Sequence, residues 1–510
     1  MNPVIVSVGS VRGELIDCPA KIEKKISEAC SYQAFNFQFS DAYLNGHWDG
    51  YIKKYSLKTH SFSSGLMYRV AQILKNEMID YEIVDSRTKF TWNEKQVLKN
   101  LSKFKFQLRP YQIDGLIRGL NVPYMVYWWA TSSGKTVQFA ALISALKRDR
   151  YRRTLILVAN KDLASQHRKE LGEMLDEPIG LIEEGRFEPK PITVAVINTL
   201  WIKGVKQKNK QIGMYLDKIE HLITDEAHHA IDSKMFKQTI RKCKNTLARH
   251  GFSGTPFSLT TDDLELESVT GPPLSKVSMS RLIQEGWVSV PHIYMFKYNS
   301  LPVQKNLKNY AALYRKAISE NVVRNKAIRD IATFEYETFE NDTTLIIIKL
   351  IDHGRKLKEM IIDNGVDSDD IKFIHGSTAK NVRDSVKEAF KDKELRIVIA
   401  SSIWIEGIDI PTVNALIMAA AGGGKEIADK KGIRAVIQQI GRVIRKPIKE
   451  GEEDVDQGEV NNVRIYDFLD SSHKDVMRHS MNRFLTFKME EEFKVKEVNY
   501  DSWKSKNGII

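Results

Sequence analysis

The chain has 510 residues, of which 42% are hydrophobic and 28% charged, and its formal net charge is +12. This composition excludes a disordered or fibrous protein, and the length predicts two large domains with smaller parts beside them. The three cysteines, Cys18, Cys30 and Cys243, lie far apart without C-x-x-C pairing, so we expect neither a disulfide framework nor a cysteine zinc site. The basic excess favours a nucleic acid as partner, although it would also aid solubility.

The chain shows no pattern typical of export or of membrane insertion. Residues 1–6 lack a basic segment followed by a long apolar run. The longest apolar run, residues 345–348, is far too short to span a bilayer. We therefore expect a cytoplasmic protein that does not associate with membranes.

The first hundred residues predict a small α+β module. Apolar side chains alternate over residues 4–8 and 35–39, as in half-buried strands, and residues 51–55 and 81–84 are further predicted strands. Helices are predicted near residues 22–29 and 64–78.

Lysines and aromatic residues mingle in residues 48–58 of this module. Lys53 and Lys54 can contact nucleic-acid phosphates there while the aromatic rings stack. A hairpin with packed aromatic rings and solvated lysines explains these residues at least equally well.

Residues 124–142 have the order strand, tight loop, helix. Residues 124–128 are apolar and β-prone, residues 130–136 form a polar loop, and residues 137–142 begin a helix. A helix N-terminus offers unpaired backbone N–H groups and the positive end of the helix dipole, which suit a polyphosphate. The alternative is a polar loop that joins strand and helix without a ligand.

Four consecutive residues of this loop carry the predicted nucleotide chemistry. Ser133 and Gly134 allow close approach of the backbone, and the Lys135 ammonium can reach the β- and γ-phosphates. The Thr136 hydroxyl can ligate Mg²⁺. Trp129 occupies the position of the first glycine in the usual G-x-x-x-x-G-K-[ST] pattern.

The segment before the loop, residues 103–112, is the predicted junction into the next domain. The Gln112 amide can hydrogen-bond an adenine edge, and Arg109 or Tyr111 can support the base. A helix start with Pro110 in its first turn is compatible with this role.

Buried strands alternate with helices after the loop. Residues 154–158 and 192–197 are near-continuous apolar runs, as expected for strands covered on both faces of a parallel sheet. Polar residues that follow such strands face the binding edge of the sheet. We therefore expect Lys161, Gln166 and Thr199 near a ligand, with a nucleic-acid backbone as the candidate.

The next predicted strand, residues 221–224, leads into a pair of adjacent carboxylates. Asp225 can hold the same Mg²⁺ as the loop threonine, and Glu226 can orient and deprotonate the attacking water. His228 and His229 suggest either a zinc site or a coupling of nucleotide state to the neighbouring domain. The coupling is favoured because no other ligand cluster has metal spacing. The hydroxyl-rich loop at residues 251–256 is predicted to sense the γ-phosphate.

The second half of the chain repeats the alternating plan after a boundary near residue 290 and a β-rich connection over residues 288–298. His375 and Ser401 end two of its strands and are predicted to contact nucleic acid. The predicted strands are residues 344–349, 371–375, 396–401, 413–418 and 464–469, with helices at 353–362 and 383–390. The tail from residue 471 is predicted to be helical and basic.

Three polar residues near the end of the second half share one face of a predicted helix. They are Gln438, Arg442 and Arg445. Two arginines directed at one point suit a phosphate whose charge spreads in the transition state. The glycine run at residues 422–424 is interpreted as a linker, because no strand-loop-helix pattern surrounds it.

The order of these motifs over residues 107–470 resembles that of superfamily 2 helicases. The tetrad at residues 225–228, followed by Ser-Gly-Thr-Pro at 253–256, is similar to the DNA-repair branch rather than the DEAD-box RNA branch. The resemblance implies that Gly407 and Asp409 contact nucleotide and DNA, and that Arg442 and Arg445 are arginine fingers. It also implies that ATP and Mg²⁺ bind between two motor domains.

Residues 45–50 resemble the small N-terminal domain of phage branch-migration helicases, which implies a DNA-binding role for the first module. The expected fold is α/β, with two RecA-like parallel-sheet domains in tandem after a small α+β domain. The expected bounds are 1–100 for the small domain, 101–290 and 291–470 for the motor domains, and 471–510 for the tail.

The resemblance implies an ATP-dependent DNA helicase that remodels forks and Holliday junctions in replication, recombination or repair. We expect it to act as a monomer in a bacterial or phage-infected cell. The alternatives are a translocase on double-stranded DNA that does not separate strands, an RNA helicase, and a nucleic-acid-binding protein without catalysis.

Overall fold

A computed structural model describes the chain in ranges that leave short gaps. The described residues are 3–34, 36–87, 92–102, 104, 106–146, 153–229, 233–254, 263–303, 309–401, 413–421, 440–441 and 462–509. Contacts divide the chain into two compact units. The first unit is Met1–Ala130 with Gly134–Val277, and the second is Thr131–Ser133 with Ser278–Ile510.

The first unit begins with an N-terminal module, residues 3–87, built on a five-stranded sheet of order β5-β6-β2-β1-β7. The strands are β1 (Val4–Val8), β2 (Arg12–Ile16), β5 (Tyr55–Ser56), β6 (Ser61–Ser63) and β7 (Tyr81–Asp85). Alternate residues of β1 are buried, as its sequence predicts. Helices α1 (Ala20–Ala29) and α3 (Met67–Asn76) pack apolar side chains into the same core as β1.

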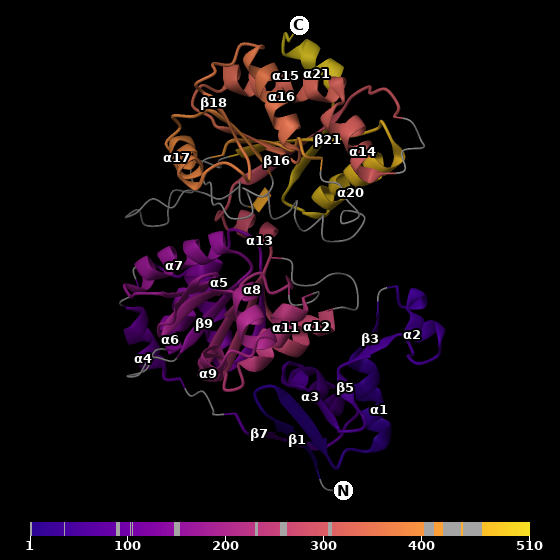
Figure 1. Cartoon of the computed structure of the whole chain (residues 1–510), viewed down its shortest axis with the longest axis vertical. Coiled ribbons are helices and arrows are strands. Elements are labelled where there is room, and N and C mark those ends of the chain that lie inside the picture. The colour runs from indigo at the N-terminus through magenta and orange to yellow at the C-terminus, as the bar shows by residue number, and fades with distance from the viewer. Residues whose placement is uncertain are drawn as a thin grey trace. The chain divides into compact units, whose positions relative to one another are not determined.

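A smaller two-stranded ribbon, β3 (Ser31–Gln33) with β4 (Tyr51–Lys53), extends from this module (Figure 1). The strand predicted over residues 35–39 is wrong, because Phe37–Phe39 forms a 3₁₀ helix, η1. Asn36 has a left-handed φ of 55°, which interrupts an extended run and which asparagine tolerates. Phe37 and Phe39 instead lie in this 3₁₀ turn, which precedes α2 (Asp41–Leu44).

The rest of the first unit is the first α/β domain, described residues 92–277, which holds an eight-stranded sheet of order β11-β10-β12-β9-β13-β14-β8-β15. The strands are β8 (Tyr124–Trp129), β9 (Thr154–Val158), β10 (Gly180–Glu183), β11 (Arg186–Glu188), β12 (Ile192–Val196), β13 (His221–Thr224), β14 (Ala248–Ser253) and β15 (Pro273–Val277). Every neighbouring pair is parallel except β10 with β11.

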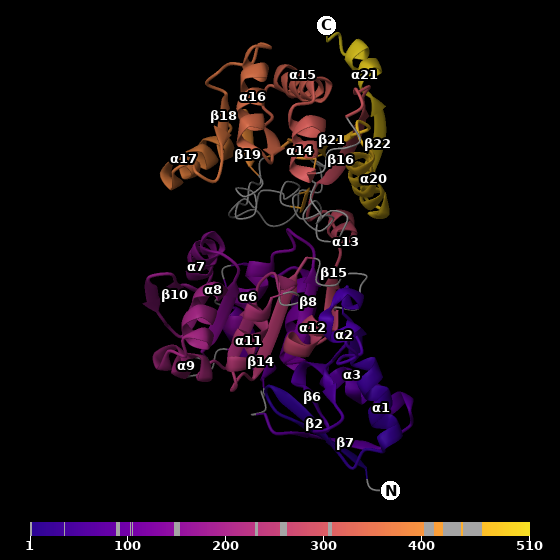
Figure 2. The ribbon, with the colours of Figure 1, turned by 45° about the vertical axis from the view of Figure 1, so that its right-hand side comes forward.

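Helices cover both faces of this sheet (Figures 1 and 2). They are α4 (Glu94–Leu101), α5 (Pro110–Asn121), α6 (Lys135–Leu146), α7 (Lys161–Leu175), α8 (Ile197–Leu200) with the π-helical η3 (Trp201–Lys206), α9 (Lys210–Asp217), α11 (Lys234–Lys242) and α12 (Asp263–Thr270). Strand β14 lies between β8 and β13. Because all three are parallel, the loops that follow them lie at one edge of the sheet.

The second α/β domain, described residues 278–509, holds a seven-stranded, all-parallel sheet of order β18-β19-β17-β20-β21-β16-β22. Its strands are β16 (Val290–Lys297), β17 (Thr344–Ile348), β18 (Ile371–Ile374), β19 (Ile397–Ser401), β20 (Ala415–Ile417), β21 (Asn462–Leu469) and β22 (Lys494–Asn499). Its helices are α13 (Met279–Gln284), α14 (Tyr310–Tyr314) with the π-helical η4 (Arg315–Ser319), α15 (Val322–Thr338), α16 (Ile351–Ile362), α17 (Lys380–Lys391), α20 (Lys474–Met489) and α21 (Tyr500–Lys506).

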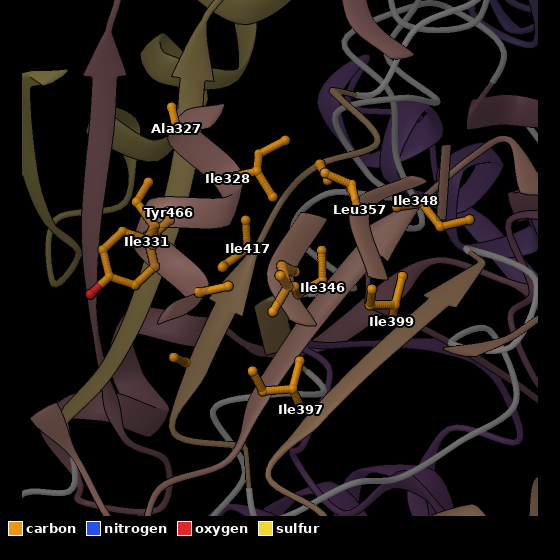
Figure 3. Packing of buried hydrophobic residues seen from close by; sticks show 14 of the residues in the cluster. Ala327, Ile328, Ile331, Ile346, Ile348, Leu357, Ile397, Ile399, Ile417 and Tyr466 are labelled. Carbon is orange, nitrogen blue, oxygen red and sulfur yellow. The ribbon is translucent and has the colours of Figure 1, made fainter. Parts of the chain in front are cut away.

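Branched aliphatic residues form the core of this second domain (Figure 3). Ile328 and Ile331 of α15 and Leu357 of α16 pack in one cluster with Ile346 and Ile399 of the central strands. These strands are fully buried, which agrees with their near-continuous apolar sequences.

Two predictions for the second domain differ from the structure. Residues 290–297 are not connecting chain but strand β16, which pairs with both β21 and β22. The tail is not helical throughout, because β22 adds a strand at the sheet edge (Figure 2). Half-exposed Val495 and Val498 are its only apolar residues, and an edge strand with charged neighbours has a weak sequence pattern.

Both α/β domains have the RecA-like plan of a parallel sheet covered by helices, in tandem in one chain. Among the described residues, no helix combines the length and the apolar character needed to cross a membrane.

Candidate functional site

The predicted phosphate loop lies where β8 ends and α6 begins. Gly134 has a φ of +75°, and a Cβ atom there would lie 2.6 Å from Nε2 of Gln112. Only glycine fits both the backbone conformation and the space. The Gln112 Oε1 accepts a hydrogen bond from the Arg109 backbone N–H at 2.9 Å, and its Nε2 lies 3.5 Å from the Gly134 carbonyl oxygen, so Gln112 lies against the loop.

Trp129 explains how the loop departs from the usual pattern. Its side chain is fully buried and makes edge contacts with Tyr111 and Tyr127, each with ring centroids 5.4 Å apart. Its indole N–H donates to Ser275 Oγ at 2.8 Å. Strand β8 therefore continues through Trp129 into the core, and the phosphate loop begins after it.

Lys135 contacts the predicted catalytic base across the sheet edge. Its Nζ lies 3.4 Å from Oε1 of Glu226, and the two side chains are 13% and 15% exposed. A distance of 3.4 Å makes this a loose ion pair. The Thr136 hydroxyl has no hydrogen-bond partner within the described part of the chain and is half-buried. These side chains fit a phosphate and a divalent cation, since the ammonium and the hydroxyl can turn to a ligand.

Asp225 follows β13 and is held by two hydrogen bonds. Its Oδ2 lies 2.9 Å from Nε2 of the buried His167 on α7, and its Oδ1 accepts from the Glu226 backbone N–H at 2.9 Å. Burial lowers the pKa of His167, but the hydrogen bond and charge of Asp225 outweigh burial, so that the pKa is raised. Glu226 has a left-handed φ of 45°, a conformation that costs a non-glycine residue free energy and is common at functional sites.

His228 joins the carboxylates to the loop after β14. Its Nδ1 lies 2.8 Å from Ser253 Oγ and 3.3 Å from Glu226 Oε2. His229 instead stacks on Phe236 of α11, with ring centroids 6.0 Å apart. Across the described residues, no three His, Cys, Asp or Glu side chains gather as a metal cluster. The geometry of His228 fits the predicted coupling.

The predicted nucleic-acid contacts of the first α/β domain lie near the same edge. Lys161 and Gln166 are both on α7, where they pair with Glu184 at 2.9 Å and Glu170 at 2.6 Å. Thr199 is buried in α8. Helix α7 thus carries exposed polar residues directly beside His167, the residue that contacts Asp225.

Ser401 ends strand β19 of the second domain, and His375 directly follows the adjacent parallel strand β18. The Ser401 hydroxyl is buried without a hydrogen-bond partner in the described residues. The His375 ring accepts from the Ser377 backbone N–H at 3.3 Å. The two residues lie at one edge of the second sheet.

The two lysines of the N-terminal module have different surroundings. Lys53 is exposed and pairs with Asp49 at 2.5 Å. Lys54 pairs with Glu265 of α12, and its side chain is only 12% exposed. The Lys54 ammonium thus joins the N-terminal module to the first α/β domain, and its predicted phosphate contact stays a prediction.

Several predicted residues lie outside the described residues. They are Gly407, Asp409, Gln438, Arg442 and Arg445, together with Thr255 and Pro256. Sequence analysis also missed His167, although it directly follows Gln166 on the helix after a buried strand. Its position next to Gln166 was the one feature of the sequence that could have indicated a place near the site.

Comparisons with known proteins match both domains. Residues 105–258 match the family described as Type III restriction enzyme, res subunit, and residues 325–447 match the helicase conserved C-terminal domain. A putative DNA 3'-5' helicase Rad25 from Haloarcula marismortui is 27% identical over 349 residues, 67% of this chain and 51% of that protein. The DNA 3'-5' translocase XPB2 of Sulfurisphaera tokodaii is 22% identical over 451 residues, 81% of this chain and 92% of that protein.

The chain thus spans about half the length of the first relative and most of the second. The crystal structure of T4 UvsW is similar over 98% of this chain and 100% of that chain, at 19% identity and a TM-score of 0.46. A TM-score this low does not establish a shared arrangement, so the resemblance to phage branch-migration helicases rests on the sequence alone.

A phosphate loop beside two carboxylates at the carboxyl edge of a parallel sheet is the arrangement of a nucleoside triphosphatase motor. A second RecA-like domain follows in the same chain, and it matches the helicase C-terminal family. Residues 105–258 and 325–447 thus carry the two tandem RecA-like domains of a helicase motor.

Proposed function

We propose that the chain is an ATP-dependent helicase of superfamily 2 that acts on DNA, and that it remodels branched DNA by moving along the strands. One observation supports ATP hydrolysis: four polar residues meet at one edge of the first sheet. They are Lys135, Asp225, Glu226 and His228, and each lies within 3.4 Å of another of the four. DNA as the substrate is supported by the two relatives, which are named as a putative DNA helicase and a DNA translocase.

The residues of the site suggest how hydrolysis proceeds. Lys135 would leave Glu226 for the nucleotide phosphates, since a 3.4 Å ion pair is easily exchanged. The released Glu226 carboxylate would orient the attacking water and accept its proton. Thr136 and Asp225 would hold Mg²⁺, which when bound neutralises charge on the phosphates.

Two contacts connect this chemistry to the rest of the domain. His228 links Glu226 to Ser253, so a change at the carboxylate reaches the loop after β14. His167 links Asp225 to α7, which carries Lys161 and Gln166. DNA held at α7 would thereby act on the position of Asp225. From the second domain, Arg442 and Arg445 would stabilise the charge on the phosphate in the transition state, with Gln438 on the same face of their helix.

A translocase on double-stranded DNA is the second candidate. It is favoured by the S. tokodaii relative, which is named as a translocase and of which this chain covers 92%. Branched-DNA remodelling is supported instead by the resemblance at residues 45–50.

ATP hydrolysis measured with different nucleic acids tests the proposal. We expect the greatest stimulation from a four-way junction, less from linear duplex or single-stranded DNA, and least from RNA. Lys135→Ala should abolish hydrolysis in every case, whereas the exposed Lys242→Ala should not. Equal stimulation by linear duplex would favour the translocase, and stronger stimulation by RNA would indicate an RNA substrate. A hydrolysis rate unaffected by Lys135→Ala would contradict the role of Lys135 in ATP hydrolysis.

A further inference from the structure

The N-terminal module is joined to the first α/β domain by a buried carboxylate. Glu265 of α12 is 4% exposed and accepts a hydrogen bond from the Tyr32 hydroxyl at 2.6 Å. It also pairs with Lys54 of the module and, at 3.0 Å, with Lys237 of α11. A buried carboxylate with three donors from two parts of the chain holds those parts in one arrangement.

A second carboxylate and a close backbone contact reinforce this joint. Arg69 of α3 donates to both oxygens of Glu267, at 3.2 and 3.1 Å from its Nε. A Cβ atom on Gly65 would lie 2.1 Å from the Glu267 carbonyl oxygen, so the two backbones touch. Leu264 also packs in the core of the N-terminal module. The surface beside this joint is therefore preformed.

An open pocket of about 250 Å³ lies beside the joint, and both parts line it. The module contributes side chains of β2 and of residues 53–63, and the first α/β domain contributes Arg241 at the end of α11. The charged lining residues are Arg12, Lys53, Lys54 and Arg241, and the lining hydroxyls belong to Tyr55, Ser56, Ser61 and Ser63. Its volume suits a phosphate group with part of a sugar rather than a larger organic ligand.

The charge of this basic pocket is not balanced. Neither Arg12 nor Arg241 has a carboxylate partner in the part of the chain that the structure describes. The Arg12 guanidinium instead donates to the Thr59 hydroxyl at 2.6 Å and to Ser61. The ion pair of Lys53 is exposed, and such pairs exchange readily.

The pKa of Lys54 reports the same excess of positive charge. Burial lowers this pKa, Glu265 opposes the effect, and the nearby Lys237 and Arg241 lower it further. Two of these cations, Lys54 and Arg241, line the pocket itself. An anion that entered would relieve their mutual repulsion.

We propose that the basic pocket binds a phosphodiester of the nucleic-acid backbone, so that the N-terminal module and helix α11 grip the same strand. This inference rests on the proposed function, because it assumes a nucleic-acid substrate. Arginine guanidinium groups bind phosphate through two parallel hydrogen bonds, and serine hydroxyls add donors. Because a phosphodiester is the same at every nucleotide, binding there is expected to be independent of base sequence.

Binding of a fluorescein-labelled linear duplex, followed by anisotropy at several salt concentrations, tests this inference. The test variant is Arg12→Gln with Arg241→Gln. The matched control is Lys24→Gln with Lys242→Gln, which removes the same charge from exposed positions on α1 and α11 outside the pocket. We expect the test variant to bind about tenfold more weakly at moderate salt. Its plot of log affinity against log salt should be shallower by about 0.9 for each phosphate that the protein no longer neutralises.

Parallel measurements separate the possible outcomes. ATP hydrolysis without nucleic acid should be the same in wild type and both variants. If wild-type protein hydrolyses ATP but binds neither DNA nor RNA duplex, the proposed function fails. If wild type binds duplex and the test variant binds as the control does, the inference about the pocket is overturned. Displacement by tripolyphosphate together with an unchanged salt slope would assign the pocket to a free polyphosphate and would also overturn it.

Discussion

Two pairs of carboxylates occupy the same kind of position in the two α/β domains and have opposite surroundings. Asp225 and Glu226 follow strand β13 of the first sheet, and Asp467 and Asp470 lie at the end of β21 in the second. In both cases the acids lie at or just beyond the carboxyl end of a buried parallel strand, where ligands usually bind. Position in the fold therefore does not distinguish them.

The partners do distinguish them. Arg483 pairs with Asp467 at 2.7 Å and Arg324 with Asp470 at 2.9 Å, with all four side chains at most 1% exposed. Glu226, by contrast, is 15% exposed and faces Lys135 at 3.4 Å. A buried guanidinium neutralises a carboxylate permanently, whereas a loose, accessible ammonium can be exchanged for a ligand. The comparison assigns structural stability to the second pair of acids and chemistry to the first.

Glu226→Gln should have the largest effect. The amide keeps the size of the side chain but cannot accept a proton, so kcat for ATP hydrolysis should fall by about 10³-fold. Thermal unfolding should change little. Steady-state hydrolysis at saturating nucleic acid measures this, and a fall of less than about tenfold would contradict the role of Glu226.

Arg483→Met should destabilise the second domain. It would leave Asp467 charged and buried without its partner, which lowers the free energy of unfolding by about 3–5 kcal/mol. Hydrogen exchange of β21 and α20 measures the change locally. The control Arg478→Met, on the same helix with a 57% exposed side chain, should cost less than about 1 kcal/mol. Equal effects of the two variants would remove the contrast between buried and exposed pairs.

Acid should weaken the first domain through the buried His250. Burial lowers the pKa of His250 to about 4, against a hydrogen bond to the Gly119 carbonyl that raises it. Between pH 6.5 and 4 the unfolded chain binds a proton that the native state excludes, so stability falls as the pH is lowered. The decrease approaches about 3 kcal/mol near pH 4.

Comparing the pH dependence of unfolding for wild type and His250→Gln checks this prediction. The variant lacks the hydrogen bond between His250 and His221, 3.0 Å apart, and so starts from lower stability. Its stability should nevertheless depend less on pH over this range. Identical pH dependence in both proteins would show that His250 is not the group responsible.

Lys161→Ala should have the smallest effect on stability. Both side chains of its ion pair with Glu184 are exposed, so the free energy of unfolding should hardly change. If α7 meets nucleic acid as proposed, the affinity for duplex should fall while the melting temperature does not. A melting temperature that fell with no change in affinity would give Lys161 a structural role.

The sequence predicted the parts of the site that depend on neighbours in the chain. A strand, a loop with Gly134 and Lys135, and a helix follow one another directly, so their order shows in the sequence. Asp225 and Glu226 directly follow the strand at residues 221–224, so their place at its end also shows in the sequence. Local order is sufficient for these features because parallel strands bring their loops to one edge.

The features that sequence analysis missed depend on partners far away in the chain. His167 meets Asp225 across 58 positions, and Lys54 meets Glu265 across more than two hundred. Only the packing of α7 and of the N-terminal module brings these groups together. A lysine among aromatic residues has the same local pattern whether it faces solvent or a buried carboxylate, so Lys54 could not be placed from sequence.

The comparison of the two acid pairs is tested most directly by removing one charge from each. ATP hydrolysis and thermal unfolding should be measured for Asp225→Asn and Asp467→Asn side by side. We predict that Asp225→Asn loses hydrolysis while its melting temperature shifts by no more than about 2–4 °C. We predict that Asp467→Asn unfolds at clearly lower temperature, because Arg483 would be left as an uncompensated buried charge. A variant pair with the opposite pattern, in which Asp225→Asn unfolds early and Asp467→Asn only loses hydrolysis, would contradict the account.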